Sequence, residues 1–344
     1  MLHSILVQGG DGGDTLDFST FTTAVTVDLS VLNVLQPVSP GELQLELLSA
    51  PPGVSPDVEN VVGAPGGGTL TGNSLDNAFT ITGGVNTING AAGTNTIIAA
   101  VNVNATLGAA SLSIGSNVSP LSNIQIAKLT AGNGGITINA AGFTGGTVLT
   151  GGTGNDRLIG GSGPNLFIAS PGNDILTGGA ANDTFMFDAD VVLGTDTITG
   201  GGGTDTLDFS ATSANVTINL GTLDPAPAQT VVPGFLSLIL KDKLANMIGG
   251  SGDDSLTGND LDNVITGGLG NDVITGGGGT DTVRETRDAN FILTNTSLEI
   301  YRAPLFSIAD ITDLPGLVAR LQSDVVPQTQ PVSQYLWSQF TAAA

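Results

Sequence analysis

A nine-residue period is the feature of this sequence that most constrains its fold. Between residues 151 and 183 the chain reads GGTGNDRLI-GGSGPNLFI-ASPGNDILT-GGAAND, and the sixth positions are Asp156, Asn165, Asp174 and Asp183. The eighth positions are always large and apolar, namely Leu158, Phe167, Leu176 and Phe185. Such a regular spacing is typical of stacked repeats, in which each nonapeptide is one structural unit.

The two parts of the nonapeptide favour different conformations. The first six residues are rich in glycine, which accepts positive φ and close backbone approach, so they predict a turn. The last three place one large apolar side chain between smaller ones, which predicts a short strand with one face inward. Two units then form one flattened coil, and successive coils stack as parallel strands.

One unit is too small to fold by itself. Ordering nine residues costs roughly 9–18 kcal/mol at about 1–2 kcal/mol each. Burying one Leu or Phe side chain returns only about 1.5–3 kcal/mol. Each coil therefore needs neighbours on both sides, and its turns need a further source of stability.

The aspartates indicate what that source is. Residues eighteen positions apart share one edge of the stack, so Asp156 lies over Asp174 and Asp254 over Asp272. Carboxylates about 4.8 Å apart repel by roughly 1 kcal/mol in water and about 3 kcal/mol near a protein surface. A hard divalent cation between them reverses the sign, and ligands that are all oxygen favour calcium.

This motif resembles the RTX (hemolysin-type) calcium-binding nonapeptide GGxGxDxUx, and the resemblance is specific because the motif recurs in phase. The resemblance implies an all-β fold, a parallel β-roll with calcium ions between adjacent coils. It also implies export of the chain in an unfolded, calcium-free state.

Composition narrows the possible partners. The 344 residues carry a net charge of −23, and 26 of the 31 acidic residues are Asp, which suits turns, while only 5 are Glu. This acidity argues against nucleic acid and anionic membranes as partners. The absence of cysteine excludes disulfides and thiolate metal sites and fits an exported protein held by metal.

The two ends of the chain differ in what their sequences predict. Residues 1–8 lack the basic region and apolar core of a secretory signal, and no run of eighteen apolar residues predicts a membrane span. A complete motif already begins at Gly9, which suggests a fragment of something longer. In residues 301–344, a short helix from Ile311 and the aromatic side chains favour either a cap on the stack or an export signal.

We expect six segments along the chain. They are a partial repeat with a Pro-rich excursion (1–62), a degenerate Asn-rich solenoid (63–148), a calcium-binding block (149–210), a strand and loop insert (211–245), a second calcium-binding block (246–284) and a C-terminal strand and cap (285–344). In the Asn-rich segment the sixth positions are Gly68, Asn77, Asn86, Asn95 and Asn104, with Thr106 in the apolar position of the last unit. Asn supplies neutral oxygen only, so these coils are predicted to bind no calcium. A strand or short helix is expected at residues 42–48.

A longer repeat overlies the short one. The segment that begins at Asp14, DTLDFSTFTTAVTVDL, resembles DTLDFSATSANVTINL from Asp205, and the segments from Gly72 and Gly258 also match. The offset is roughly 190 residues, so the chain holds two copies of a larger module.

The predicted metal ligands are the sixth-position residues of the good motifs. They are Asp14, Asp156, Asn165, Asp174, Asp183, Asp196, Asp205, Asp254, Asn263, Asp272 and Asp281. The pairs 156/174 and 254/272 are expected to bind most tightly, and the pairs 165/183 and 263/281 are expected to be weaker or empty.

Catalysis has little support in the sequence. The paired carboxylates could serve a glycosidase, but they sit at one fixed turn position in a number that suits a ligand ladder. His3 is the one histidine, and no GxxxxGK[ST] loop occurs.

We therefore expect a non-enzymatic, calcium-stabilised β-roll with a structural or adhesive role, extracellular or on a bacterial surface after non-classical or type I-like export. A surface polysaccharide and another extracellular protein stay open as partners. The alternative is the accessory region of a secreted protease, lipase or polysaccharide-modifying enzyme whose catalytic domain lies elsewhere.

Overall fold

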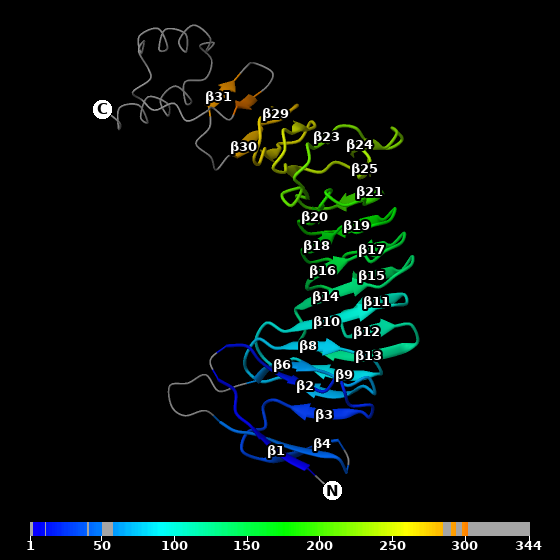
Figure 1. The fold of residues 1–344 in the computed structure, drawn as a ribbon, viewed down its shortest axis with the longest axis vertical. Helices are drawn as coiled ribbons and strands as arrows, with labels where there is room; N and C mark the ends of the chain where they lie inside the picture. Colours follow the sequence, from blue (N-terminus) through cyan, green and yellow to red (C-terminus); the bar gives the residue numbers. More distant parts are fainter. Residues whose placement is uncertain are drawn as a thin grey trace, which may run out of the picture.

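The computed structural model describes residues 3–10, 12–39, 41–49, 58–284, 290–293 and 298–301. Within these ranges the chain forms 32 strands and no helix. The strands stack along one long axis (Figure 1), and one of the two large sheets, from β2 (Asp14–Asp17) to β30 (Thr282–Arg284), follows sequence order throughout. The fold is all-β, a parallel β-roll, as the nonapeptide period predicts. The expected helix and aromatic cap of residues 302–344 lie outside the described residues.

Two twelve-stranded sheets form the two faces of the roll. The strands of sheet I are, in spatial order, β2 (Asp14–Asp17), β6 (Val58–Val62), β8 (Ala78–Ile81), β10 (Thr96–Val101), β14 (Ile126–Ala131), β16 (Gly146–Thr150), β18 (Asn165–Ile168), β20 (Thr184–Met186), β22 (Thr206–Asp208), β26 (Asn246–Ile248), β28 (Val264–Thr266) and β30 (Thr282–Arg284). The strands of sheet II are β3 (Val25–Asp28), β7 (Gly68–Thr71), β9 (Asn86–Asn89), β13 (Asn117–Ser122), β12 (Ser111–Ile114), β11 (Ala105–Gly108), β15 (Thr137–Gly142), β17 (Arg157–Ile159), β19 (Ile175–Gly179), β21 (Gly194–Gly201), β25 (Leu236–Leu240) and β24 (Gln229–Val232).

Two smaller sheets complete the described fold. Sheet III contains β23 (Thr217–Asn219), β27 (Ser255–Thr257), β29 (Asp272–Thr275), β32 (Leu298–Tyr301) and β31 (Asn290–Leu293). A three-stranded sheet at the N-terminal end contains β1 (His3–Val7), β5 (Leu43–Leu47) and β4 (Leu35–Ser39).

The parallel register aligns the apolar eighth positions in columns. In sheet I, Phe167 pairs with Leu149 on one side and with Phe185 on the other. The rings of Phe167 and Phe185 stack with centroids 4.8 Å apart, and both side chains are fully buried. The core is therefore a continuous column between the sheets, and each coil shares it with its two neighbours.

The chain leaves the nine-residue phase where it forms a hairpin. Strands β11, β12 and β13 pair antiparallel within sheet II. Around this insertion the predicted phase is wrong, because Asn104 and Thr106 are exposed while Ala105 and Leu107 face the core. An antiparallel turn fixes its own register, so the nonapeptide count does not carry across it.

The two excursions predicted from the longer repeat are alike in structure. Residues 43–47 form a strand rather than a helix, and β4 pairs antiparallel with β5 as β24 pairs with β25. The Gln36 side chain bonds to both backbone groups of Asp28, and Gln229 makes the same two bonds to Asn219. The modules thus share side-chain hydrogen bonds as well as sequence.

Candidate metal centres

The sixth-position residues that precede or begin the strands of sheet II form a column along one edge of the roll. The side-chain Oδ1 of each accepts a hydrogen bond from the backbone N–H one coil earlier. Asp156 accepts from Ile136 at 2.7 Å, Asp174 from Asp156 at 2.8 Å, and Asp196 from Asp174 at 2.8 Å. We call this column the sheet II ladder.

The opposite edge carries a matching column, the sheet I ladder. Oδ1 of Asp183 accepts from the N–H of Asn165 at 2.8 Å, and Oδ1 of Asp205 accepts from the N–H of Asp183 at 2.9 Å. The step from Asp183 to Asp205 spans 22 residues instead of 18, yet the strand register is kept. This edge therefore also stacks Asp over Asp, a pairing that the eighteen-residue rule alone overlooks.

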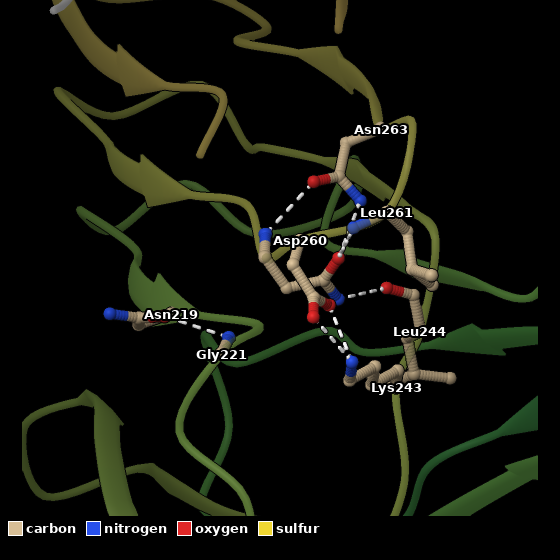
Figure 2. Close-up of polar contacts among 8 residues, drawn as sticks. Asn219, Gly221, Lys243, Leu244, Asp260, Leu261 and Asn263 are labelled. Carbon is tan, nitrogen blue, oxygen red and sulfur yellow. Dashed lines mark hydrogen bonds and ion pairs between the residues drawn. The ribbon is translucent and has the colours of Figure 1, made fainter. Parts of the chain in front are cut away.

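The second predicted block repeats both columns. Oδ1 of Asp254 accepts from Val216, and Oδ1 of Asp272 accepts from the N–H of Asp254. On the other edge Oδ1 of Asp281 accepts from Asn263 at 3.0 Å. Figure 2 shows the Asn263 amide near Asp260, whose carboxylate forms an ion pair with Lys243 at 2.6 Å.

These carboxylates are buried without a compensating positive charge. Asp156, Asp174, Asp183, Asp196, Asp205, Asp254 and Asp272 are each at most 3% exposed. The two ion pairs found among the described residues, Lys241–Asp224 and Lys243–Asp260, lie outside both ladders. A buried anion without a partner is unfavourable, so the ladders need a cation or protons.

The pKa values of these carboxyl groups also show that their buried charge is unfavourable. Burial raises the pKa of Asp174 to about 6, although the N–H of Asp156 opposes the rise. Burial raises the pKa of Asp254 to about 7 and that of Asp196 to about 8. Oδ2 of Asp196 is fully buried and has no hydrogen-bond partner among the described residues. This oxygen is therefore free to take a proton or to bind a cation.

The turn backbone brings further oxygens to the same places. A Cβ atom at Gly178 would overlap both the carbonyl oxygen of Gly200 and Oδ2 of Asp183. A Cβ at Gly249 would likewise meet the carbonyl oxygen of Gly267 and Oδ2 of Asp254. Glycine thus lets a carbonyl oxygen of the next coil approach a carboxylate. Among the described residues no three Asp, Glu or His side chains converge on one point, so backbone carbonyls would complete the coordination. This donor set fits calcium.

The ladder of the Asn-rich coils is neutral and extends further than the sequence indicates. Oδ1 of Asn95 accepts from the N–H of Asn77, and Oε1 of Gln125 accepts from the N–H of Asn95. At the N-terminal end the N–H of Asp14 donates to Oε2 of Glu59 at 2.7 Å. Glu59 and Gln125 were missed, although Glu59 lies eighteen residues before Asn77 and its place could have been read from the period.

Two other contributions were also missed. The fifth-position side chains form an exposed outer ladder, in which Asn155 accepts from the N–H of Asn173 and Asn173 from that of Thr195. Asp242 lies outside every motif but binds the N–H groups of Gly200 and Gly201 and helps to raise the pKa of Asp205. Its place is visible only in the fold, because the excursion returns to the roll there.

The fold and its ladders define a class of protein, a parallel β-roll whose turns present oxygen ligands between coils. The family model of the RTX calcium-binding nonapeptide repeat matches this chain in four copies, at residues 142–163, 150–185, 193–211 and 248–283. These residues match the RTX repeat, whose nonapeptides bind Ca²⁺. By sequence the chain matches no curated protein.

Repeat domains of this family are structural calcium-binding modules rather than catalytic ones, and they typically occur in secreted bacterial proteins. The described residues contain no helix that is long and apolar enough to cross a membrane.

Proposed function

We propose that this chain is a calcium-stabilised β-roll that serves as a structural or adhesive module of a secreted or cell-surface bacterial protein. The observation that carries the proposal is the set of buried carboxylates that stack from coil to coil without a cation partner among the described residues. Calcium would remove the repulsion between them and convert the penalty of burial into stability.

The structure favours some candidate sites over others. The pairs 156/174, 174/196, 183/205 and 254/272 each offer two buried carboxylates, so we assign calcium to these four junctions. The pairs 165/183 and 263/281 contain one Asn and one Asp, and Asp14 is only partly buried, so binding there is weaker. When bound, calcium supplies positive charge, while the chain supplies the rigid turns that hold its oxygens.

A non-catalytic role fits the chemistry of the described residues. The one histidine, His3, is exposed in β1, far along the sequence from every predicted ligand except Asp14. The partner would then be an extracellular polysaccharide or protein. The roll would bind this partner, or would act as a spacer between it and the rest of the protein. Export in the unfolded, calcium-free state would follow from the low calcium of the cytoplasm and the dependence of folding on calcium.

Calcium titration of the full chain after treatment with chelator tests this function. Calorimetry should give a stoichiometry near the number of carboxylate pairs, and far-UV circular dichroism should show a cooperative gain of β signal. The variant Asp174→Asn interrupts two adjacent junctions and should lower the stoichiometry, whereas Asp188→Asn, outside both ladders, should leave it unchanged. A chain that is fully β in chelator and binds no calcium would contradict the proposal.

A further inference from the structure

We infer that the N-terminal end of the roll is a docking face for one more nonapeptide coil of the RTX type. The inference goes beyond calcium stabilisation, because it concerns a surface rather than the turns and would hold whatever occupies the ladders. It rests on a comparison of the two modules, which show the same elements once at an end and once in the interior.

The N-terminal elements have counterparts in strand order within the second module, and the register also corresponds except for a shift at Asp14 and Thr15 in the pairing of β2 with β6. The sheet β1–β5–β4 corresponds to β21–β25–β24, since β1 pairs parallel with β5 as β21 pairs with β25. Strand β2 corresponds to β22, because β2 pairs with β6 as β22 pairs with β26.

The interior copy shows what covers such a face. There β21 pairs on its other side with β19, and β22 pairs on its other side with β20. Among the described residues β1 and β2 have no strand on that side. Among the described residues each of these two strands therefore presents one unpaired edge, and an exposed strand edge is a template for pairing.

The N-terminal face also carries a cavity, although Leu16 and Phe18 in its lining are themselves only 9% and 5% exposed. A cavity of about 450 Å³ is lined by Ile5, Val7, Leu16, Phe18 and Phe21, together with other residues of β1, β2 and β5. Ile5 is 46% exposed, while its counterpart Asp196 is fully buried. In the interior, Phe185 pairs with Leu207 and Phe187 stacks on Phe209 at 5.3 Å. Leu16 and Phe18 occupy the places of Leu207 and Phe209, and the cavity lies where the covering side chains would be.

Two differences between the modules, and one aspartate that both have at the same place, define the occupant. Phe21 replaces Thr212 and packs edge-on against Phe18, so the docking coil needs a side chain smaller than Phe at the position of Phe187. Ile5 replaces Asp196, so the coil needs an apolar residue rather than a carboxylate above it. Asp14 occupies the place of Asp205, and only its Oδ2 has a partner among the described residues, the N–H of Gly10. Its Oδ1 can accept the N–H that Asp183 donates to Asp205 in the interior.

A fusion to the full chain tests the docking face. A copy of residues 151–193, with Asp174→Val and Phe187→Ala in the copy, is joined directly to His3 so that the copied Leu193 precedes it as Leu193 precedes Gly194. The change at Asp174 places an apolar side chain above Ile5, because Asp174 is the residue that lies above Asp196 in the interior. In calcium, the amides of β1 and β2 should exchange with deuterium more slowly than in the unfused chain by about a hundredfold or more. The control fusion carries Leu176→Asp and Phe185→Asp in the copy alone, and it should leave this exchange unchanged.

Equal exchange of β1 and β2 in the unfused chain, the fusion and the control would overturn the inference, as would equal protection by both fusions.

A second measurement needs no fusion. The chain should bind an apolar fluorescent dye at this end, and Ile5→Lys, at a half-exposed site, should abolish most of that binding without altering the circular dichroism. Dye binding that is absent, or unaffected by Ile5→Lys, would also overturn it. Failure of calcium binding would appear instead as an unchanged response of residues 151–211 to chelator, so the two outcomes are distinguishable.

Discussion

The Asn coils (residues 58–101) and the Asp coils (residues 151–211) have the same backbone and differ in what holds their turns. In both, a sixth-position side chain accepts a hydrogen bond from the N–H one coil earlier, as Asn95 does from Asn77 and Asp174 does from Asp156. In both, the apolar columns continue without interruption through the core. The architecture therefore does not depend on the charge of the ladder.

The chemical difference lies in what the side chain can donate. An Asn amide accepts through its oxygen and donates through its nitrogen, and Nδ2 of Asn77 donates to the backbone carbonyl oxygen of Glu59. A carboxylate only accepts, so nearby carbonyl oxygens and its own charge remain uncompensated. The Asn side chains therefore satisfy backbone acceptors that Asp cannot, although the buried Oδ1 of Asn86 has no hydrogen-bond partner among the described residues. The Asp coils add buried negative charge, for which we propose calcium as the partner.

Removal of calcium should separate the two regions most clearly. In chelator we expect residues 151–211 and 249–283 to lose most of their protection against hydrogen exchange, because their carboxylates repel. Residues 58–101 should keep theirs. Hydrogen exchange followed by mass spectrometry of peptides from each region measures both at once, and equal loss in the two regions would contradict the comparison.

Exchanging Asn and Asp between the two ladders should exchange their dependence on calcium. Asn77→Asp with Asn95→Asp places two carboxylates in a neutral ladder, removes two amide donors and should destabilise the metal-free chain by about 1–3 kcal/mol per lost buried hydrogen bond. The reciprocal pair, Asp183→Asn with Asp205→Asn, should stabilise the metal-free chain and reduce its calcium response. Urea unfolding with and without calcium measures the change, and the isosteric swaps serve as controls for each other.

The pH dependence should have opposite signs with and without calcium. Burial raises the pKa of Asp174 to about 6 and that of Asp196 to about 8, well above an unfolded Asp near 4. The metal-free fold then binds protons that the unfolded chain releases, so its stability is greatest below about pH 4 and falls as the pH rises through 6 to 8. Calcium needs deprotonated ligands, so the calcium-dependent gain in melting temperature should grow over the same range. Melting curves at pH 5.5 and 8.5 in chelator and in calcium would show whether the signs differ.

The smallest effect is expected at the surface. Lys243 and Asp260 form an ion pair at 2.6 Å, but their side chains are 45% and 67% exposed. Lys243→Met should change stability by less than about 0.5 kcal/mol, because solvent screens exposed pairs. A larger loss in thermal melts would mean that the turn beside Asn263 depends on this cation, and that the ladder there is not self-sufficient.

Much of this fold follows from sequence because one rule is applied many times. The period of nine places Phe167 and Phe185 in the core and Asp156 over Asp174, and the structure confirms both. The rule fails where the nine-residue period is interrupted. At Asn104 the antiparallel hairpin that follows sets a new register.

The candidate ligands show the same limit. The stacking of Asp183 on Asp205 crosses a longer loop, and Asp242 joins that edge from an excursion, so only the three-dimensional path reveals either. Calcium binding by the individual residues stays a prediction.

The inner and outer ladders run in opposite senses, and this has a consequence for how the roll grows. At each junction the later coil supplies the inner acceptor, as Asp174 does for Asp156, while the earlier coil supplies the outer one, as Asn155 does for Asn173. A folded coil thus offers the next coil a backbone N–H of the inner ladder as donor and a side-chain oxygen of the outer ladder as acceptor. Because these two groups differ in kind, the next coil can pair with both in one register only. The Asn coils come first along the chain. We expect them to fold first and to serve as a nucleus to which the Asp coils add one after another when calcium is present.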